Sequence, residues 1–387
     1  MINFNFSIST QIQFGAGVSK QAGLVLKTLH NSSASGDALV IVDPGVMAVP
    51  WLKDILHSLD ENSLRYEIFD KVRPNPREED VELAAAMIKE KDFRAILAIG
   101  GGSTIDTAKG ASLLATHAGK LNDYAGWAKV PGGVIPVVAI PTTSGSGSEV
   151  TCWAVITDAH SHLKLAIGDR NLAPTVALVD PILTASLPAN TTAATGMDVL
   201  THAIEAYISS LSTPAGDLLA LEAIRLASAN LSRAVSNGSD QAAREAMSLA
   251  SVLAGVAMNN ADVAGVHCLT EGMGSLYDAP HGLLNAILLP YFMSFWKEGC
   301  QERFARIAGA FGADPKPEEA VNQVLKLTRA LKFPSLKDIG IEETDLEKLA
   351  ALAASNVSNP SNPIPMQASD YLRILELAME GNPPQAE

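Results

Sequence analysis

The chain has 387 residues, of which 47% are hydrophobic and 18% are charged. This length is enough for two ordinary domains, and the low charge content indicates either much internal surface or surface shared with another subunit. The formal net charge of −14 disfavours nucleic acids and anionic membranes as partners.

The cysteine content and the N-terminus point to a cellular compartment. The three cysteines form no Cys-x-x-Cys pair, which argues against a disulfide framework and a cysteine-based zinc site and fits a reducing environment. Met1–Thr10 does not resemble a signal peptide, and the longest apolar runs are too short to span a membrane. We therefore expect a cytoplasmic protein.

In the first half of the chain, β-rich runs alternate with amphipathic segments. The expected strands are Ala38–Val42, Arg65–Phe69, Ala95–Ile99, Pro136–Ile140 and Val176–Val179, and the expected helices include Arg77–Lys91 and Ser103–Thr116. Strand–helix–strand repetition predicts a parallel sheet with helices on both faces. Ala154–Asp158 and Leu163–Ile167 are expected to add an antiparallel hairpin to that sheet.

Beyond Pro188 the β-rich runs nearly vanish and helical periodicity takes over. The expected helices are Thr191–Ser210, Pro214–Val235, Asp240–Asn260, Leu283–Glu298, Pro317–Ala330 and Pro365–Met379. We place the boundary near Leu183–Pro188. The expected organisation is an α/β domain over residues 1–185 and an all-helical domain over residues 186–387.

A triple glycine, Gly100–Gly102, lies between an expected strand and the start of an expected helix. Glycines let the backbone approach a ligand closely, and the free N–H groups of a helix start suit a pyrophosphate. The string is neither G-x-G-x-x-G nor a Walker A loop. The alternative is a tight turn in which Ser103 and Asp106 form a capping box.

Two further expected strands end in polar groups. Pro141–Glu149, rich in hydroxyls and glycines, follows one strand, and Asp43 follows another. Ligands of open α/β sheets bind at the carboxyl ends of the strands, where a carboxylate can accept hydrogen bonds from ribose hydroxyls and repel a 2′-phosphate. Asp43 alone could be an ordinary turn residue, but three such strand ends together favour a dinucleotide site with NAD rather than NADP.

The helical half carries a candidate metal site. Asp198 and His202 are spaced i, i+4 on an expected helix and share a face, and His267 and His281 follow later. Pro280 is expected to start a new helix, so the last two imidazoles come from different helices. One carboxylate and three imidazoles suit Fe(II), Zn(II) or another divalent metal. The alternative is a set of ordinary core histidines and a local Asp–His hydrogen bond.

Taken together, these motifs resemble those of the iron-containing (group III) alcohol dehydrogenase family over nearly the whole chain. The matching segments are Phe14–Gly17, Arg73–Pro76, Gly100–Gly102, Pro141–Val150, Met197–Tyr207, Ala243–His267 and Ala279–Gly282.

The resemblance implies a Rossmann-like α/β domain, a helical domain and a cleft between them, the architecture also found in dehydroquinate synthase-like enzymes. It implies an NAD-dependent oxidoreductase that acts on a small primary alcohol or aldehyde and forms a homodimer or larger assembly. It implies that Asp198, His202, His267 and His281 hold a metal, usually Fe(II). The implied cofactor contacts are Asp43, Asn75, Gly101, Gly102, Ser103, Thr142, Ser146 and Lys164.

One position departs from the family pattern. Family members usually have a second histidine four residues after the one at His267, where this chain has Glu271. Glu271 is the candidate catalytic residue, because a glutamate there could relay protons, coordinate the metal or repel acidic substrates.

Two other functions compete with the dehydrogenase. The first is a dehydroquinate-synthase-like lyase that uses NAD transiently, although the segments around the expected ligands have few of the basic residues that an acidic substrate would need. The second is a metal-binding or assembly-forming relative in which Glu271 has ended catalysis, although the intact cofactor loops argue against it.

Overall fold

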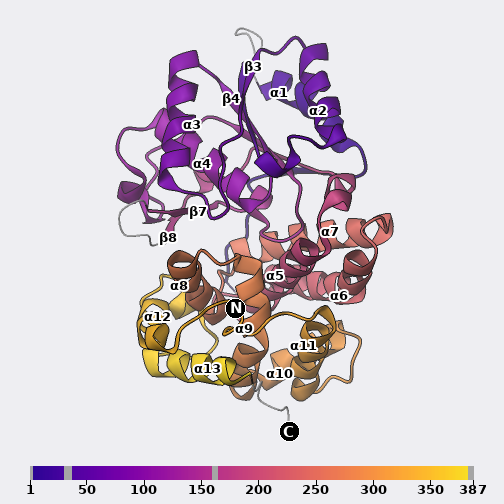
Figure 1. Cartoon of the computed structure of the whole chain (residues 1–387), viewed down its shortest axis with the longest axis vertical. Helices are drawn as coiled ribbons and strands as arrows, with labels where there is room; N and C mark the ends of the chain where they lie inside the picture. Colours follow the sequence, from indigo (N-terminus) through magenta and orange to yellow (C-terminus); the bar gives the residue numbers. More distant parts are fainter. Residues whose placement is uncertain (1–2, 30–36, 159–163, 382–387) are drawn as a thin grey trace. The chain divides into compact units, whose positions relative to one another are not determined.

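The computed structural model describes residues 3–29, 37–158 and 164–381. The chain divides into two compact units. An α/β unit comprises the described residues of Ile8–Thr143 and Gly147–Ser186, and a helical unit comprises those of Met1–Ser7, Ser144–Ser146 and Leu187–Glu387. Each unit is taken by itself below (Figure 1).

The α/β unit is built on a six-stranded sheet with the order β1-β9-β6-β4-β2-β3, in which all neighbours are parallel. The strands are β1 Gln11–Phe14, β2 Ala38–Val42, β3 Tyr66–Phe69, β4 Ala95–Gly100, β6 Val137–Pro141 and β9 Val176–Val179. The strands predicted from the sequence are therefore present, with ends shifted by one residue at most. Strand β1 was not predicted.

Helices cover both faces of this sheet, as predicted. Alternate residues of β2 point to opposite faces: Leu39 and Ile41 belong to a core beneath α3 and α4, and Val40 and Val42 belong to a core beneath α1 and α2. Figure 1 shows the two helix pairs on either side of the sheet. These helices are α1 Ala22–Leu29, α2 Pro50–Glu61, α3 Glu78–Lys91 and α4 Gly102–Thr116.

The predicted hairpin exists, but its predicted place in the main sheet is wrong. Strands β7 (Trp153–Thr157) and β8 (Lys164–Gly168) pair antiparallel in a separate three-stranded sheet, where β8 also pairs with β5 (Gly126–Trp127). The main sheet ends at β1 on one side and at β3 on the other, so the hairpin adds no strand to it. Leu163, the first residue of the predicted second strand, lies outside the described residues.

The helical unit contains the six predicted helices and others that the periodicity missed. The helices are α5 Ala189–Ile208, α6 Pro214–Ser236, α7 Gln241–Asn259, α8 Gly265–Tyr277, α9 His281–Trp296, α10 Gln301–Ala310, α11 Pro317–Leu331, α12 Leu346–Ala354 and α13 Ala368–Glu380. None of the described helices is long and apolar enough to cross a membrane.

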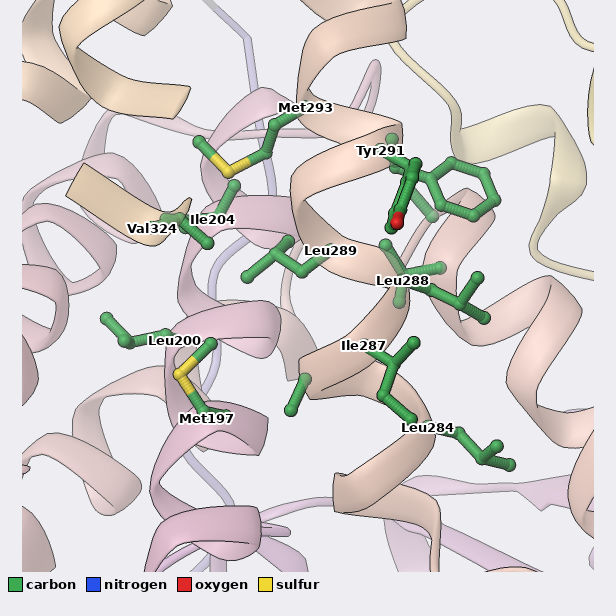
Figure 2. Close-up of a cluster of buried hydrophobic side chains, with 14 of the residues drawn as sticks. Met197, Leu200, Ile204, Leu284, Ile287, Leu288, Leu289, Tyr291, Met293 and Val324 are labelled. Atoms are coloured by element: carbon green, nitrogen blue, oxygen red, sulfur yellow. The ribbon is translucent and has the colours of Figure 1, made fainter. Parts of the chain in front are cut away.

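Helices α5 and α9 share the core of this unit. Figure 2 shows Met197, Leu200 and Ile204 of α5 beside Leu289 and Met293 of α9. These three positions recur at helical spacing and form the apolar face of α5. Asp198 and Glu205 directly follow Met197 and Ile204 in sequence, so they project about 100° around the helix from this face. Both belong to the site described next.

Candidate metal centre and nucleotide loops

Four side chains of the helical unit converge on one point. Asp198, His202, His267 and His281 each present a possible ligand atom, and these atoms all lie within 4.8 Å of one another. The Oδ1 atom of Asp198 is 3.8 Å from Nδ1 of His202, 4.0 Å from Nε2 of His267 and 3.9 Å from Nε2 of His281. The four residues proposed from the sequence are thus brought together, from helices α5, α8 and α9.

The start of α9 lies close to α5 because position 282 is glycine. A Cβ atom there would lie only 2.6 Å from the carbonyl oxygen of Ala194, far inside contact distance. Pro280 is the N-cap of α9 and His281 its first residue, as predicted. This arrangement brings the imidazole of His281 to the ligands of α5.

Glu205 holds His267 in place. It lies one helical turn beyond His202 on α5, is fully buried, and accepts a hydrogen bond from Nδ1 of His267. It also accepts from the backbone N–H groups of Ala264 (3.0 Å) and Val266 (2.7 Å), at the N-terminus of α8. One carboxylate therefore satisfies free donors of α8 and fixes the tautomer that leaves Nε2 of His267 as a ligand atom.

His202 provides a direct test of whether a metal fits. Its imidazole is buried, and its Nδ1 has no hydrogen-bond partner among the described residues. An unpaired buried polar nitrogen is costly, and coordination of a cation would satisfy it. Burial lowers the pKa of His202, an effect that Asp198 offsets only in part, so the ring is held in the neutral form that a metal requires.

His267 and His281 differ from His202 in their surroundings. Burial lowers the pKa of His267, but the charge and hydrogen bond of Glu205 outweigh burial and leave the pKa above its ordinary value. A proton therefore competes with a metal at this ring. The side chain of His281 is 27% exposed, against 5–7% for the other three ligands, so the cluster is most accessible on the His281 side.

Glu271, the candidate catalytic residue, lies outside the four-residue cluster. It is half-buried on α8, one turn after His267, and its carboxylate accepts a hydrogen bond of 2.8 Å from Nδ2 of Asn356. Its charge acts on His267, where it favours the protonated ring. The structure thus places Glu271 near the cluster with its carboxylate bound to an amide.

Three polar neighbours of the ligands were not predicted from the sequence: Glu205, Thr270 and Asn285. Each follows a ligand at helical spacing, Glu205 three residues after His202, Thr270 three after His267 and Asn285 four after His281. That spacing was a usable signal for side chains on the ligand-bearing faces.

The predicted nucleotide loops follow adjacent strands of the sheet in the α/β unit. Asp43 comes after β2, Gly101–Ser103 after β4, and Thr142 after β6. The backbone links these ends, since the N–H of Asp43 donates to Ile99 and the N–H of Thr142 donates to Gly100, both at 3.0 Å. Because the chain runs from β2 outward to β3 and then returns to β4 on the other side, β2 and β4 flank a topological switch point.

The glycine loop is tightly packed. A Cβ atom at Gly100 would lie 2.2 Å from Oγ1 of Thr104. The alternative capping box is wrong: the N-cap of α4 is Gly101, and the carboxylate of Asp106 accepts instead from the hydroxyl of Ser148 and from the N–H of Val155. The free N–H groups at the start of α4 therefore have no side-chain cap of their own.

The other cofactor candidates do not lie on the loops after β4 and β6 that carry Gly101–Ser103 and Thr142, except for Ser146, which comes four residues after Thr142. Asn75, at a positive φ of 52°, accepts a 3.3 Å hydrogen bond from Nζ of Lys164 on β8. Ser146 groups with the helical unit rather than with the sheet. The carboxylate of Asp43 accepts from the N–H of Gly45 at 2.7 Å, so it does serve as the turn residue that the alternative described.

Family models match both halves of the chain. A model described as "Iron-containing alcohol dehydrogenase" matches residues 9–181, and one described as "Fe-containing alcohol dehydrogenase family, C-terminal" matches residues 192–379.

Individual relatives match over most of their length. The NAD-dependent methanol dehydrogenase of Bacillus methanolicus is 37% identical over 383 residues, covering 97% of this chain and 100% of that protein. The 1,3-propanediol dehydrogenase of Klebsiella pneumoniae is 39% identical over 336 residues, covering 84% of this chain and 87% of that protein. A crystal structure of 1,3-propanediol oxidoreductase is similar with a TM-score of 0.93 at 36% identity, covering 97% and 100% of the two chains. The chain therefore belongs to the iron-containing alcohol dehydrogenase family of oxidoreductases, as its motifs predict.

Proposed function

We propose that the protein interconverts a small primary alcohol and its aldehyde, with NAD(H) as the hydride carrier and a divalent metal, Fe(II) in the first instance, held by Asp198, His202, His267 and His281. The observation that carries this proposal is the convergence of one carboxylate and three imidazoles. One of the imidazoles, that of His202, has a buried Nδ1 without a hydrogen-bond partner among the described residues. Such a donor set suits Fe(II) and also Zn(II).

The bound cation supplies Lewis acidity toward the oxygen of the alcohol or aldehyde. The protein's own residues prepare the site for it. Glu205 holds the proton of the neutral His267 ring on Nδ1, so that Nε2 is the atom that faces the cluster. The apolar face of α5 fixes the backbone that carries Asp198 and His202. The greater exposure of His281 favours approach of the substrate from that side.

For the cofactor we propose contacts from Asp43, Asn75, Gly101, Gly102, Ser103, Thr142, Ser146 and Lys164. The support is the switch point between β2 and β4, where Asp43 and the uncapped start of α4 follow neighbouring strands. A carboxylate at Asp43 favours NAD over NADP. The Bacillus methanolicus relative is described as NAD-dependent, which agrees with this choice.

For Glu271 we propose a part in proton transfer during turnover. The support is its place one turn after His267 and the hydrogen bond from Asn356, which holds the carboxylate in one orientation. Replacement by Gln keeps the size of the side chain and removes its charge. If Glu271→Gln leaves both the pH–rate profile and the metal content as in the native enzyme, this part of the proposal is withdrawn.

The central test uses full-length protein stripped with a chelator and reloaded with Fe(II), Zn(II) or another divalent ion. NADH formation is followed with methanol, 1,3-propanediol and simple alkanols, and NADH consumption with the corresponding aldehydes. Chelation should abolish turnover, and one of the metals should restore it. Net NADH production with a simple alcohol would also separate the dehydrogenase from a lyase that uses NAD only transiently.

His267→Ala should lose both bound metal and turnover. His57→Ala is the matched control, because His57 is an exposed histidine that pairs with Glu61 on the surface of α2. A His267→Ala protein that turns over alcohol without metal would refute the proposed function.

A further inference from the structure

Asn285 lies at the centre of the ligand cluster although it is not one of the four ligands. It is on α9, one turn after His281, and is fully buried. Its Nδ2 atom is 2.7 Å from Oδ1 of Asp198, 3.3 Å from Nε2 of His267 and 3.2 Å from Nε2 of His281. A single amide nitrogen therefore contacts three of the four ligand atoms.

The amide can point only one way. A carboxylate oxygen accepts hydrogen bonds and never donates them, so the group that faces Asp198 must be the NH₂ and not the carbonyl. The carbonyl oxygen of Asn285 then faces Thr270, whose hydroxyl donates to it at 2.8 Å. Thr270 is also fully buried, so no solvent competes for this hydrogen bond.

We propose that Asn285, oriented by Thr270, is a positioning residue that fixes the carboxylate of Asp198 for metal binding. This inference rests on the proposed metal site. Oδ1 of Asp198 has more than one lone pair, so it can accept from Asn285 and still serve as a ligand. The hydrogen bond therefore removes the freedom of the carboxylate to turn away from the three imidazoles.

The contacts with the two imidazoles have a different meaning. Each Nε2 atom has one lone pair, which can bind either the amide N–H or a cation, but not both. The second N–H of Asn285 is thus shared between these two nitrogens in metal-stripped protein and yields them to an incoming ion. Asn285 keeps the ligand atoms gathered at the cost of a modest competition with the metal.

The test measures metal affinity and not activity alone. Stripped full-length protein is titrated with Zn(II) in competition with a chromophoric chelator, and the visible spectrum of the Co(II) form reports ligand geometry. Asn285→Ala and Thr270→Val should each weaken Zn(II) binding by roughly 10–100-fold, the usual effect of losing a partner of a metal ligand. Both should also alter the Co(II) spectrum.

Two comparisons make the result specific. Thr270→Ser keeps the hydroxyl and should restore affinity to near the native value. Thr328→Val is the matched control: Thr328 is a half-buried residue of α11 whose hydroxyl donates to the carbonyl of Leu325, so this change should leave affinity and spectrum unaltered. Should Asn285→Ala fail to fold, the Thr270 pair still decides the question.

The failures are distinguishable. Native protein that binds no Zn(II) would remove the proposed metal site and this inference with it. Native protein that binds Zn(II) tightly, with Asn285→Ala and Thr270→Val binding equally well, would overturn the role of Asn285 alone. The role of Asn285 is also overturned if Thr270→Ser binds as weakly as Thr270→Val, because the hydroxyl would then not be the cause.

Discussion

Glu205 carries three hydrogen bonds on one fully buried carboxylate, from His267 and from the N–H groups of Ala264 and Val266. In Glu205→Gln an NH₂ group must face at least one of these N–H donors, which leaves two donors opposed and unsatisfied. We expect the change to weaken metal binding by about 10–100-fold while the chain still folds.

Competition with a chelator measures this effect. Glu222→Gln is the matched control, because Glu222 lies on the exposed surface of α6 and pairs with Arg225. Unchanged affinity in Glu205→Gln would mean that the tautomer of His267 does not depend on this carboxylate.

A second buried carboxylate, Glu149 in the α/β unit, makes stability depend on pH. Burial raises its pKa from 4.5 to about 7, against smaller opposing effects that include the charge of the buried Lys109. Below pH 4.5 the carboxyl group is protonated in both folded and unfolded chains, so its ionisation does not lower the free energy of unfolding. As pH rises from 4.5 to 7 the unfolded chain loses its proton first, so stability falls by roughly 3 kcal/mol and stays lower above pH 7.

Glu149→Gln should therefore be more stable than the native chain at pH 8 and about equally stable at pH 4.5. Urea denaturation at the two pH values measures the difference, with Glu298→Gln on the protein surface as the control for loss of a charge. A native stability that does not fall between pH 4.5 and 7 relative to Glu149→Gln would contradict this account.

At the scale of elements, the metal centre depends on how closely α9 approaches α5. A methyl group at Gly282 would meet the backbone of Ala194 at 2.6 Å and must push the helices apart. We expect Gly282→Ala to lower stability by about 1–3 kcal/mol and to weaken metal binding, since His281 and Asn285 move with α9.

The control for Gly282→Ala is Gly309→Ala on α10. Apart from its chain neighbours and the nearby backbone of α10, no described residue comes within 4 Å of a Cβ atom at Gly309. Alanine there should therefore leave metal binding unchanged and raise stability by about 0.5–1 kcal/mol. Thermal unfolding and Zn(II) titration of both variants check the pair. Equal behaviour of the two would show that close approach of α5 and α9 does not matter.

The elements also show what the sequence could and could not predict. Strands β2, β4 and β6 were predicted because they are continuous apolar runs. The metal ligands were predicted because carboxylates and imidazoles are rare on apolar helices. The sheet that contains the β7–β8 hairpin was predicted wrongly, because periodicity defines a strand but not the strands beside it. Asn285 and Thr270 follow ligands at helical spacing, but the sequence does not show that Asn285 contacts both Thr270 and Asp198. Those contacts form only where α5, α8 and α9 meet.

At the scale of the whole molecule, the candidate metal ligands all belong to the helical unit, whereas the cofactor candidates, apart from Ser146, belong to the α/β unit. The bound metal and the bound cofactor should therefore stabilise different parts of the chain. A metal present at about 100 times its Kd stabilises the state that binds it by about 2.7 kcal/mol, and this energy suppresses opening of the helices that carry the ligands.

Hydrogen exchange read out by mass spectrometry resolves this prediction along the chain. Saturating Zn(II) should slow exchange in peptides from α5, α8 and the start of α9, with little change in peptides from α3. NAD should slow exchange in the segments that follow β2, β4 and β6. In His267→Ala the effect of Zn(II) should vanish while the effect of NAD remains, because Asp43 and the glycine loop are untouched by that change. Slower exchange with Zn(II) that centres on the glycine loop, or that survives in His267→Ala, would contradict this prediction. It would place the metal elsewhere in the chain and not at the cluster on α5, α8 and α9.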